Sequence, residues 1–306
     1  MSGSTEQLSR KISGAKDLGG VVRAMKALAA SSVGQYERAV ESLDDYLRTV
    51  ELGLIACMHG DAQSLRAGEI KQRHTQQIGA VIFGSDQGLV GSFNDVIVEF
   101  SLQALRALPG KVTQIWVVGE RAKALLAQST PSPVRGLEVP SSLDAITPLV
   151  GQILLEIQSA REKGEVWEIQ VFHNHPKQSS AYEPVGKRML PLDQSWQERL
   201  HATPWPTKTS PQVIDDISSA LPAFIQDYLF VLLFQACAES LASENASRLA
   251  SMQRAEKSID GMLDDLNRKF HRLRQEGIDE ELFDVLAGFE ALTKKNSRER
   301  LGSVTK

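Results

Sequence analysis

Glycines and small polar residues follow the first predicted strand of the chain, where backbone N–H groups could bind phosphate. The segment reads Gly84-Ser-Asp-Gln-Gly-Leu-Val-Gly91 and precedes a predicted helix, the usual place for such a site in α/β proteins. Its spacing is not G-x-G-x-x-G, and no G-K-[ST] supplies the lysine and hydroxyl of a phosphate-binding loop. A nucleotide site and a structural turn both remain open, and we favour a turn built on Asp86, Gly88 and Gly91.

Two histidines could offer imidazoles to a metal ion. His173 and His175 stand two positions apart at the end of a predicted strand, so their side chains share one face. No third histidine, cysteine or carboxylate stands at ligand spacing beside them. We therefore expect a solvated strand end, with no metal site and no cofactor.

The sequence contains no catalytic motif around its other reactive side chains. Serines, histidines and aspartates are numerous, but no G-x-S-x-G turn and no cysteine with a local signature is present. We therefore assign no catalytic residue. Cys57 and Cys237 are too few for a disulfide framework and lack zinc-type spacing, which favours a reducing compartment.

Composition excludes several classes of protein. The 306 residues carry 34 Lys and Arg against 38 Asp and Glu, a net charge of -4, so no overall excess would hold nucleic acid. Met1 to Gln7 has neither an apolar signal core nor an Arg-rich transit stretch. The most apolar segment, Tyr228 to Ala238, is well short of the roughly 20 residues that cross a bilayer. We expect a folded protein with a cytoplasmic address.

Both ends of the chain are predicted to be long helices. Apolar residues recur at alternating spacings of four and three from Leu8 to Cys57 and again from Leu249 to Leu273, with few polar interruptions. A period of 3.5 keeps one seam facing a partner helix and predicts a left-handed coiled coil. Two amphipathic helices folded into a globular bundle are the alternative.

Proline positions predict the ends of the second helix, and a pair of glycines predicts a weak point in the first. The second helix is predicted to begin near Pro211 and, because no proline follows Pro222, to run to about Lys295. In the first helix Gly19 and Gly20 each cost about 1 kcal/mol relative to alanine. We expect local fraying or a close helix contact there.

The middle of the chain alternates strands with helices. Short β-branched and aromatic runs predict strands at 77–86, 113–119 and 166–172, with weaker candidates at 134–139 and 185–190. Helical spacing is found at 92–108, 120–128 and 142–163. This order predicts an open α/β sheet. The six prolines between Pro176 and Pro211 predict a loop-rich return to the last helix.

The last predicted helix also carries a basic block followed by an acidic block. The residues are Arg268, Lys269, Arg272 and Arg274, then Glu276, Asp279, Glu280, Glu281 and Asp284. They are either a solvated face with pairs along the helix or charges that touch a ring-shaped partner.

Three motifs in order carry a resemblance to a known family. Residues 238–252, then Arg274-Gln275 and 278–282, closely resemble the C-terminal helix of the gamma subunit of F-type ATP synthases. Arg23 to Ser31 is similar to that family's A-M-K-x-x-A-A-S motif, and 85–94 to its S-D-R-G-L-C-G-G-F-N turn. Gln87, Val90 and Ser92 depart from the latter, and a Lys/Arg cluster is missing at 32–36, which points to a divergent branch.

The resemblance implies an architecture and a role. The architecture is an antiparallel coiled coil of residues 1–60 and 211–306 with a Rossmann-like open-sheet domain at 75–208 inserted between them. The implied role is that of a non-catalytic rotor, which stands in an α3β3 ring and contacts the epsilon subunit and the membrane c-ring. The complex is expected to move ions and to make or hydrolyse ATP. Its expected location is the cytoplasmic face of the plasma membrane. The residues implied to contact the catalytic ring are Met25, Lys26, Arg248, Arg274, Gln275 and Asp279. The alternatives are a stand-alone α/β enzyme or nucleotide binder with helical arms, and a coiled-coil scaffold without rotary partners.

Overall fold

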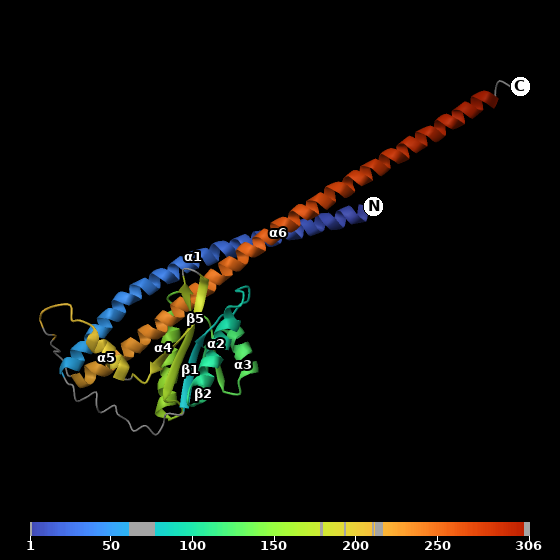
Figure 1. Ribbon diagram of the computed structural model, residues 1–306. Coiled ribbons are helices and arrows are strands. Elements are labelled where there is room, and N and C mark those ends of the chain that lie inside the picture. The colour runs from blue at the N-terminus through green and yellow to red at the C-terminus, as the bar shows by residue number, and fades with distance from the viewer. Residues whose placement is uncertain are drawn as a thin grey trace. The chain divides into compact units, whose positions relative to one another are not determined.

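The computed structural model describes residues 2–60, 77–177, 180–192, 194–209, 211 and 217–302 (Figure 1). The chain divides into two compact units, and both long helices contribute to each of them. One, the helical unit, comprises Met1–Lys26 and Met252–Lys306. The other, the sheet unit, comprises Ala27–Ser251. The division predicted from the sequence, at 1–60, 75–208 and 211–306, follows the boundaries of the long helices, whereas the two compact units divide each of these helices. The predicted division stays a prediction.

Two helices account for the two ends of the chain, as the apolar spacing predicts. The N-terminal helix α1 spans Ser2–Gly60, and the C-terminal helix α6 spans Ile217–Gly302. The predicted start near Pro211 differs from this, since Pro211 is not helical and 212–216 lie outside the described residues. Every predicted seam position of α1 from Leu8 to Cys57 is buried or half-buried. The period of 3.5 therefore identified the buried face of α1 correctly.

In the helical unit, α1 and α6 are held together by a small apolar cluster. Val22, Met252 and Ile259 are its buried members, and Met25, Ala255 and Leu263 pack against them. Gly19 lies opposite Ile259, whose Cγ2 would be 3.4 Å from a Cβ at this position, whereas a Cβ at Gly20 would meet no described atom within 4 Å. Of the two outcomes expected for this glycine pair, close helix contact holds at Gly19, and α1 continues as helix through both.

The sheet unit contains a five-stranded sheet in the order β3-β2-β1-β4-β5. The strands are β1 Gln77–Phe83, β2 Lys111–Val118, β3 Val134–Leu137, β4 Glu168–Lys177 and β5 Ser180–Leu190. The first four pair in parallel, and β5 joins β4 antiparallel at the edge. The predicted strands are confirmed, including the two weaker candidates. An edge position lets β5 accommodate Pro184, which cannot donate a ladder hydrogen bond.

Helices cover both faces of the sheet and make it a three-layer α/β structure (Figure 1). The connecting helices are α2 Phe93–Ala107, α3 Glu120–Ser129 and α4 Ile146–Glu162. Ile78, Ala80 and Ile82 of β1 face α2 and α3. Val81 and Phe83 face the opposite way, toward α4 and α6. This alternation along a strand is the period of two that a sheet buried on both faces requires.

A short helix that the sequence analysis missed follows β5. Helix α5 spans Gln194–Ala202, within the segment predicted to be loop-rich. Its Trp196 and Leu200 are buried in a cluster with Leu54 of α1 and Tyr228 of α6. The spacing of four between the apolar residues Trp196 and Leu200 indicates a helix, but the surrounding prolines favoured a loop in the sequence analysis.

Helix α6 also contains the most apolar stretch of the described residues. An 18-residue window within Ala220–Phe289 reaches a mean hydropathy of 1.5, enough by composition to be considered for a membrane span. Leu233, Cys237 and Leu241 of this stretch are buried against the sheet, and Tyr228 and Val231 are also buried. These side chains contribute to the core of the sheet unit, while 33% of the window as a whole is buried.

Candidate functional site

The glycine-containing segment after β1 forms a turn that joins three elements. The Ser85 N–H donates to Asn94 Oδ1 at 2.9 Å, and Asn94 Nδ2 donates to Ser85 Oγ at 2.8 Å. The Asp86 carboxylate accepts the N–H groups of Glu120 at 2.9 Å and Val139 at 3.2 Å. These bonds tie the end of β1 to the starts of α2 and α3 and to the loop after β3.

Backbone conformation fixes the course of this turn. Gly91 has a φ of 60° and Leu89 a φ of 64°, in the region that glycine adopts most readily, while Gly88 is exposed. At Gly119, where φ is 107°, a Cβ would come within 2.7 Å of the Ser85 backbone. The loops after β1 and β2 therefore pass too closely for a side chain at position 119.

Serines of α6 fill the place where a nucleotide would bind in a sheet of this order. The strand order reverses between β1 and β4, and open α/β sheets bind ligands in the crevice outside the carboxyl ends of such strands. Ser240 Oγ donates to the Phe83 carbonyl at 3.5 Å, Ser243 Oγ to the Asn174 carbonyl at 2.9 Å, and Ser247 Oγ to the Val90 carbonyl at 2.6 Å. This occupied crevice favours the structural turn over the nucleotide site.

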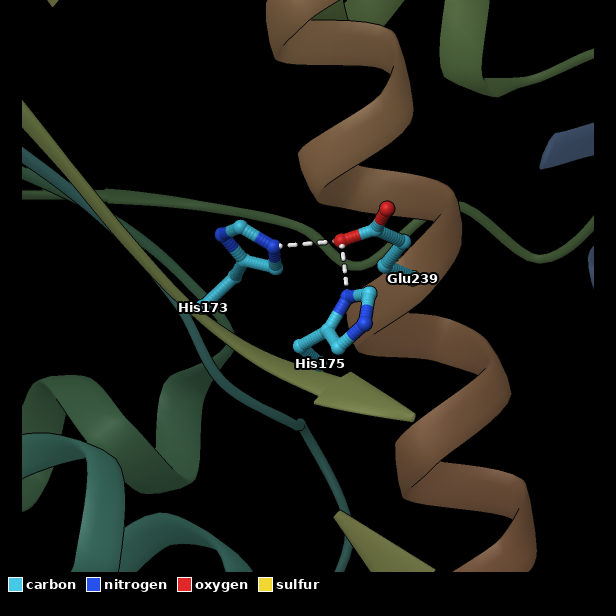
Figure 2. A group of neighbouring side chains, drawn as sticks. All are labelled: His173, His175 and Glu239. Atoms are coloured by element: carbon cyan, nitrogen blue, oxygen red, sulfur yellow. Dashed lines mark hydrogen bonds and ion pairs between the residues drawn. The ribbon is translucent and has the colours of Figure 1, made fainter. Parts of the chain in front are cut away.

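Two histidines of β4 meet a glutamate of α6. His173 Nε2 lies 2.7 Å and His175 Nδ1 2.8 Å from Glu239 Oε2 (Figure 2). The side chains of His173 and Glu239 are 4% and 5% exposed, and that of His175 is 46% exposed. The expectation of a solvated strand end is therefore wrong for His173. A carboxylate does stand with the histidines, but more than sixty positions away in the sequence.

Burial and hydrogen bonding set the protonation of this group, which we call the triad. Burial by itself raises the pKa of Glu239, but the hydrogen bonds from His173 and His175 outweigh burial and lower the pKa to about 2. Burial lowers the pKa of His173 in spite of its bond to Glu239. The triad therefore holds an ionised carboxylate, and desolvation favours the neutral form of the His173 imidazole.

A cavity of about 450 Å³ adjoins the triad within the sheet unit. His173 and Glu239 line it, together with the cationic side chains of Lys187, Arg188 and Arg199. Trp196 and Tyr228 contribute aromatic walls. The cavity thus combines a basic lining with access to the triad.

The residues that the resemblance implies for partner contact lie in both units. Lys26 pairs with Glu256 at 2.5 Å in the helical unit, and Met25 packs in the apolar cluster beside it. Arg274, Gln275 and Asp279 are exposed on α6 in the same unit. The structure therefore brings Lys26 to the seam between the helices and leaves the other three side chains on the surface.

Arg248 differs from these exposed residues because its guanidinium is engaged within the sheet unit. It donates to Glu244 Oε1 at 2.5 Å and to Asn245 Oδ1 at 3.4 Å, and its side chain is 15% exposed. Burial raises the pKa of Glu244, and Arg248 offsets only part of that rise. The contact predicted for Arg248 with a partner stays a prediction.

Charged residues farther along α6 form pairs within the helix. Arg268 pairs with Asp265 at 2.6 Å and Arg272 with Glu276 at 2.9 Å. All four side chains are 46% exposed or more. For these pairs the arrangement is that of a solvated face, and exposed pairs of this kind contribute little stability.

Comparisons with known proteins cover nearly the whole chain. The family model described as "ATP synthase" matches residues 4–292. The curated relatives include the ATP synthase gamma chain of Polynucleobacter asymbioticus, 22% identical over 293 residues, and that of Gluconobacter oxydans, 28% identical over 300 residues. Each of these matches covers 94% of this chain and 99% of the relative.

Solved structures share the fold at lower identity. A rotor chain of the Euglena gracilis mitochondrial ATP synthase is 16% identical with a TM-score of 0.62, and the match covers 91% of this chain and 100% of that one. A central stalk and c-ring structure of the Tetrahymena thermophila mitochondrial ATP synthase contains a chain that is 19% identical with a TM-score of 0.53, covering 77% and 99%. These likenesses establish the fold, in which two long terminal helices flank an α/β sheet in the sequence.

Proposed function

This chain belongs to the ATP synthase family, and from that membership we propose that it is the gamma subunit, the central-stalk rotor of a membrane F-type ATP synthase. The observation that carries the proposal is the extent of the likeness to gamma chains, 94% of this chain and 99% of each relative. It accounts for both long helices and for the sheet between them. The rotor is not a catalyst by itself, and ATP is made or hydrolysed in the β subunits around it.

The rotor acts through its shape and its contacts. A shaft of two helices that is asymmetric about its axis presents a different face to each of three catalytic subunits. Each step of rotation then favours a different conformation at each site, because the contacts differ. Rotation of the c-ring, driven by ions, is coupled in this way to ATP synthesis.

Partners follow from this role. The Euglena rotor structure, and a second structure of the Euglena ATP synthase that contains F1 and the c-ring, support an α3β3 ring and a membrane c-ring as partners of this chain. We add the epsilon subunit at the foot of the stalk. The complex is placed at the cytoplasmic face of the plasma membrane, where this chain is peripheral and touches the membrane only through its partners.

Contact with the catalytic ring is assigned to Met25, Lys26, Arg248 and the surface residues Arg274, Gln275 and Asp279. Exposure of the last three on α6 supports a role at an interface. Lys26 and Met25 instead stabilise the helix pair through Glu256 and the apolar cluster, so part of their contribution is to hold the rotor's shape.

Co-purification from native membranes tests the proposed function. A tagged form of this chain is extracted gently, its partners are identified, and the recovered material is assayed for ATPase activity. We expect α, β, epsilon and c subunits with ATPase activity. Recovery of this chain alone, from membranes that contain α and β, would contradict the proposal and favour a scaffold.

A further inference from the structure

The triad of His173, His175 and Glu239 places three potential metal ligands at one point of the sheet unit. The two ring nitrogens and the carboxylate oxygen all lie within 4.8 Å of one another. Figure 2 shows both imidazoles, from one face of β4, directed at the same oxygen of the α6 carboxylate. Side chains from two different elements therefore converge on one small volume.

The types of these side chains select the kind of ion. Two imidazoles and one carboxylate form a set that binds Zn²⁺ at about 2.0–2.2 Å, with a fourth position left for water or another ligand. Calcium and magnesium prefer oxygen ligands and are not matched by two nitrogens. The donors therefore fit a zinc-type divalent transition metal ion.

Small movements suffice to admit such an ion. Ligand atoms around a tetrahedral zinc ion are about 3.3 Å apart, as follows from metal–ligand bonds of about 2.0 Å. The present nitrogen-to-oxygen distances of 2.7 Å and 2.8 Å must each lengthen by about half an ångström. The half-exposed His175 can move away from Glu239 without disturbing other side chains of the core. The distance between His173 and Glu239 lengthens only if one of these two buried side chains shifts by a similar amount.

The surroundings orient the carboxylate and provide room for a further ligand. Gln235 Nε2 donates to Glu239 Oε1 at 3.0 Å, which leaves Oε2 directed at the histidines. The adjoining cavity is lined by His173 and Glu239 and by three cationic side chains. The positive charge of Lys187, which acts on His173, opposes a bare cation. A small anion in the cavity would offset this repulsion.

From these observations we propose that His173, His175 and Glu239 form a binding site for one zinc-type divalent metal ion, which links β4 to α6. The ion would replace the two hydrogen bonds that now join strand and helix by three coordinate bonds. Its effect would be to strengthen the docking of the long helix on the sheet. The inference concerns this chain alone and does not rest on the rotor function.

The experiment uses the full chain, purified with a tag that contains no histidine and treated with a chelator. Zn²⁺ is titrated by calorimetry, Co²⁺ is added to follow its visible absorption, and thermal unfolding is recorded with and without Zn²⁺. The test variant is His175→Ala at the half-exposed ligand, with His175→Asn as a second variant that keeps a polar group. The control is His271→Ala, which removes an exposed histidine of α6 outside the triad.

We expect one Zn²⁺ per chain, Co²⁺ absorption typical of a tetrahedral site with nitrogen ligands, and a higher unfolding temperature with Zn²⁺. Losing a direct ligand should weaken binding by at least about 100-fold, since loss of an outer-shell partner alone costs 10- to 100-fold. The His271→Ala variant should bind as the unchanged chain does. Absence of stoichiometric binding, or unchanged affinity in both His175 variants, would overturn the site and leave the triad as a hydrogen-bonded link only.

Discussion

Individual serines explain the composition of the motif at residues 238–249. Ser240, Ser243 and Ser247 lie on one face of α6 and donate to carbonyls at the carboxyl ends of β1 and β4 and in the turn after β1. Larger side chains would keep the helix away from these carbonyls, and apolar ones would leave the carbonyls without these donors. The motif thus supplies side chains that are small enough for α6 to pack closely against the sheet and polar enough to donate hydrogen bonds to its carbonyls.

Glu156 shows how one side chain on α4 joins two strands. Its carboxylate accepts hydrogen bonds from Trp116 Nε1 at 3.0 Å on β2, from Arg135 at 3.2 Å on β3, and from Gln152 at 3.1 Å on its own helix. Burial alone would raise the pKa of Glu156, but these bonds and the charge of Arg135 lower it below the ordinary value of 4.5. The ionised form is therefore more stable in the folded state than in the unfolded one.

The variant Glu156→Gln should lose this pH-dependent stability. Because the folded pKa is lowered, the contribution of the charge is present above about pH 4.5 and is lost as the pH falls through the folded pKa. We expect the variant to be less stable by about 1 kcal/mol at pH 7, and the difference to shrink toward pH 3. Urea unfolding at several pH values measures it.

The matched control for this prediction is Glu162→Gln on the same helix. Glu162 is exposed and accepts a hydrogen bond from Gln158. Its substitution should change the free energy of unfolding much less. A difference between Glu156→Gln and the unchanged chain that does not vary from pH 7 to pH 3 would contradict the assignment of the effect to the ionised carboxylate.

Pairing of the two long helices depends on a few buried residues in the helical unit. Val22, Met252 and Ile259 form the cluster, and Lys26 and Glu256 add a half-buried ion pair at 2.5 Å. Lys26 and Glu256 were the polar interruptions in the two apolar series. Their pairing explains why a polar residue occurs in each series at the seam, since the two charges satisfy one another there.

The variant Ile259→Ala should loosen this pairing. Ile259 is 6% exposed, and truncation of a buried isoleucine to alanine costs about 2 kcal/mol or more. We expect faster hydrogen exchange in α1 near Val22 as well as in α6 near residue 259, because each helix protects the other. Hydrogen-exchange mass spectrometry of the full chain measures both segments.

Met262→Ala provides the comparison on the same helix. Met262 is 53% exposed, so its truncation removes little buried surface and should leave exchange near Val22 almost unchanged. Equal effects of the two substitutions would mean that the cluster does not hold the helices together.

In a rotor, the coupling of rotation to ATP synthesis depends on residues that contact the partner subunits. Gln275 is exposed in the helical unit, whereas Arg248 is bound to the buried Glu244 in the sheet unit. Substitution of Arg248 removes the proposed ring contact and also leaves the buried Glu244 carboxylate without its cation. The two effects have to be separated in any test of coupling.

We expect Arg248→Ala combined with Gln275→Ala to lower the rate of coupled ATP synthesis in the assembled complex by about tenfold, equivalent to about 1.4 kcal/mol of activation free energy. Folding of the subunit should be affected less. Synthesis is measured in membrane vesicles, and the thermal stability of the purified variant chain is measured beside it.

Single variants resolve the two contributions. Gln275→Ala should lower synthesis without changing stability, while Arg248→Ala should lower both. Gln253→Ala, at an exposed position of α6 outside the assigned contacts, should have no effect on either. Normal synthesis in the assembled double variant would contradict the assignment of these two residues to ring contact.

The sequence by itself determined the elements that depend on local pattern. The seam from Leu8 to Cys57, the strands of the sheet and their connecting helices follow from side-chain periodicity, which the backbone geometry of helix and strand imposes. The motifs at 23–31, 85–94 and 238–252 indicated the family, because they are read directly from residue order.

Only the tertiary structure decided which distant side chains meet. Glu239 joins His173 and His175, which lie more than sixty positions away in the sequence. Helix α5 gains its burial from α1 and α6 rather than from its own short sequence. Spacing along the chain carries no information on such contacts, since burial and pairing between elements arise only when the helices pack against the sheet and against each other.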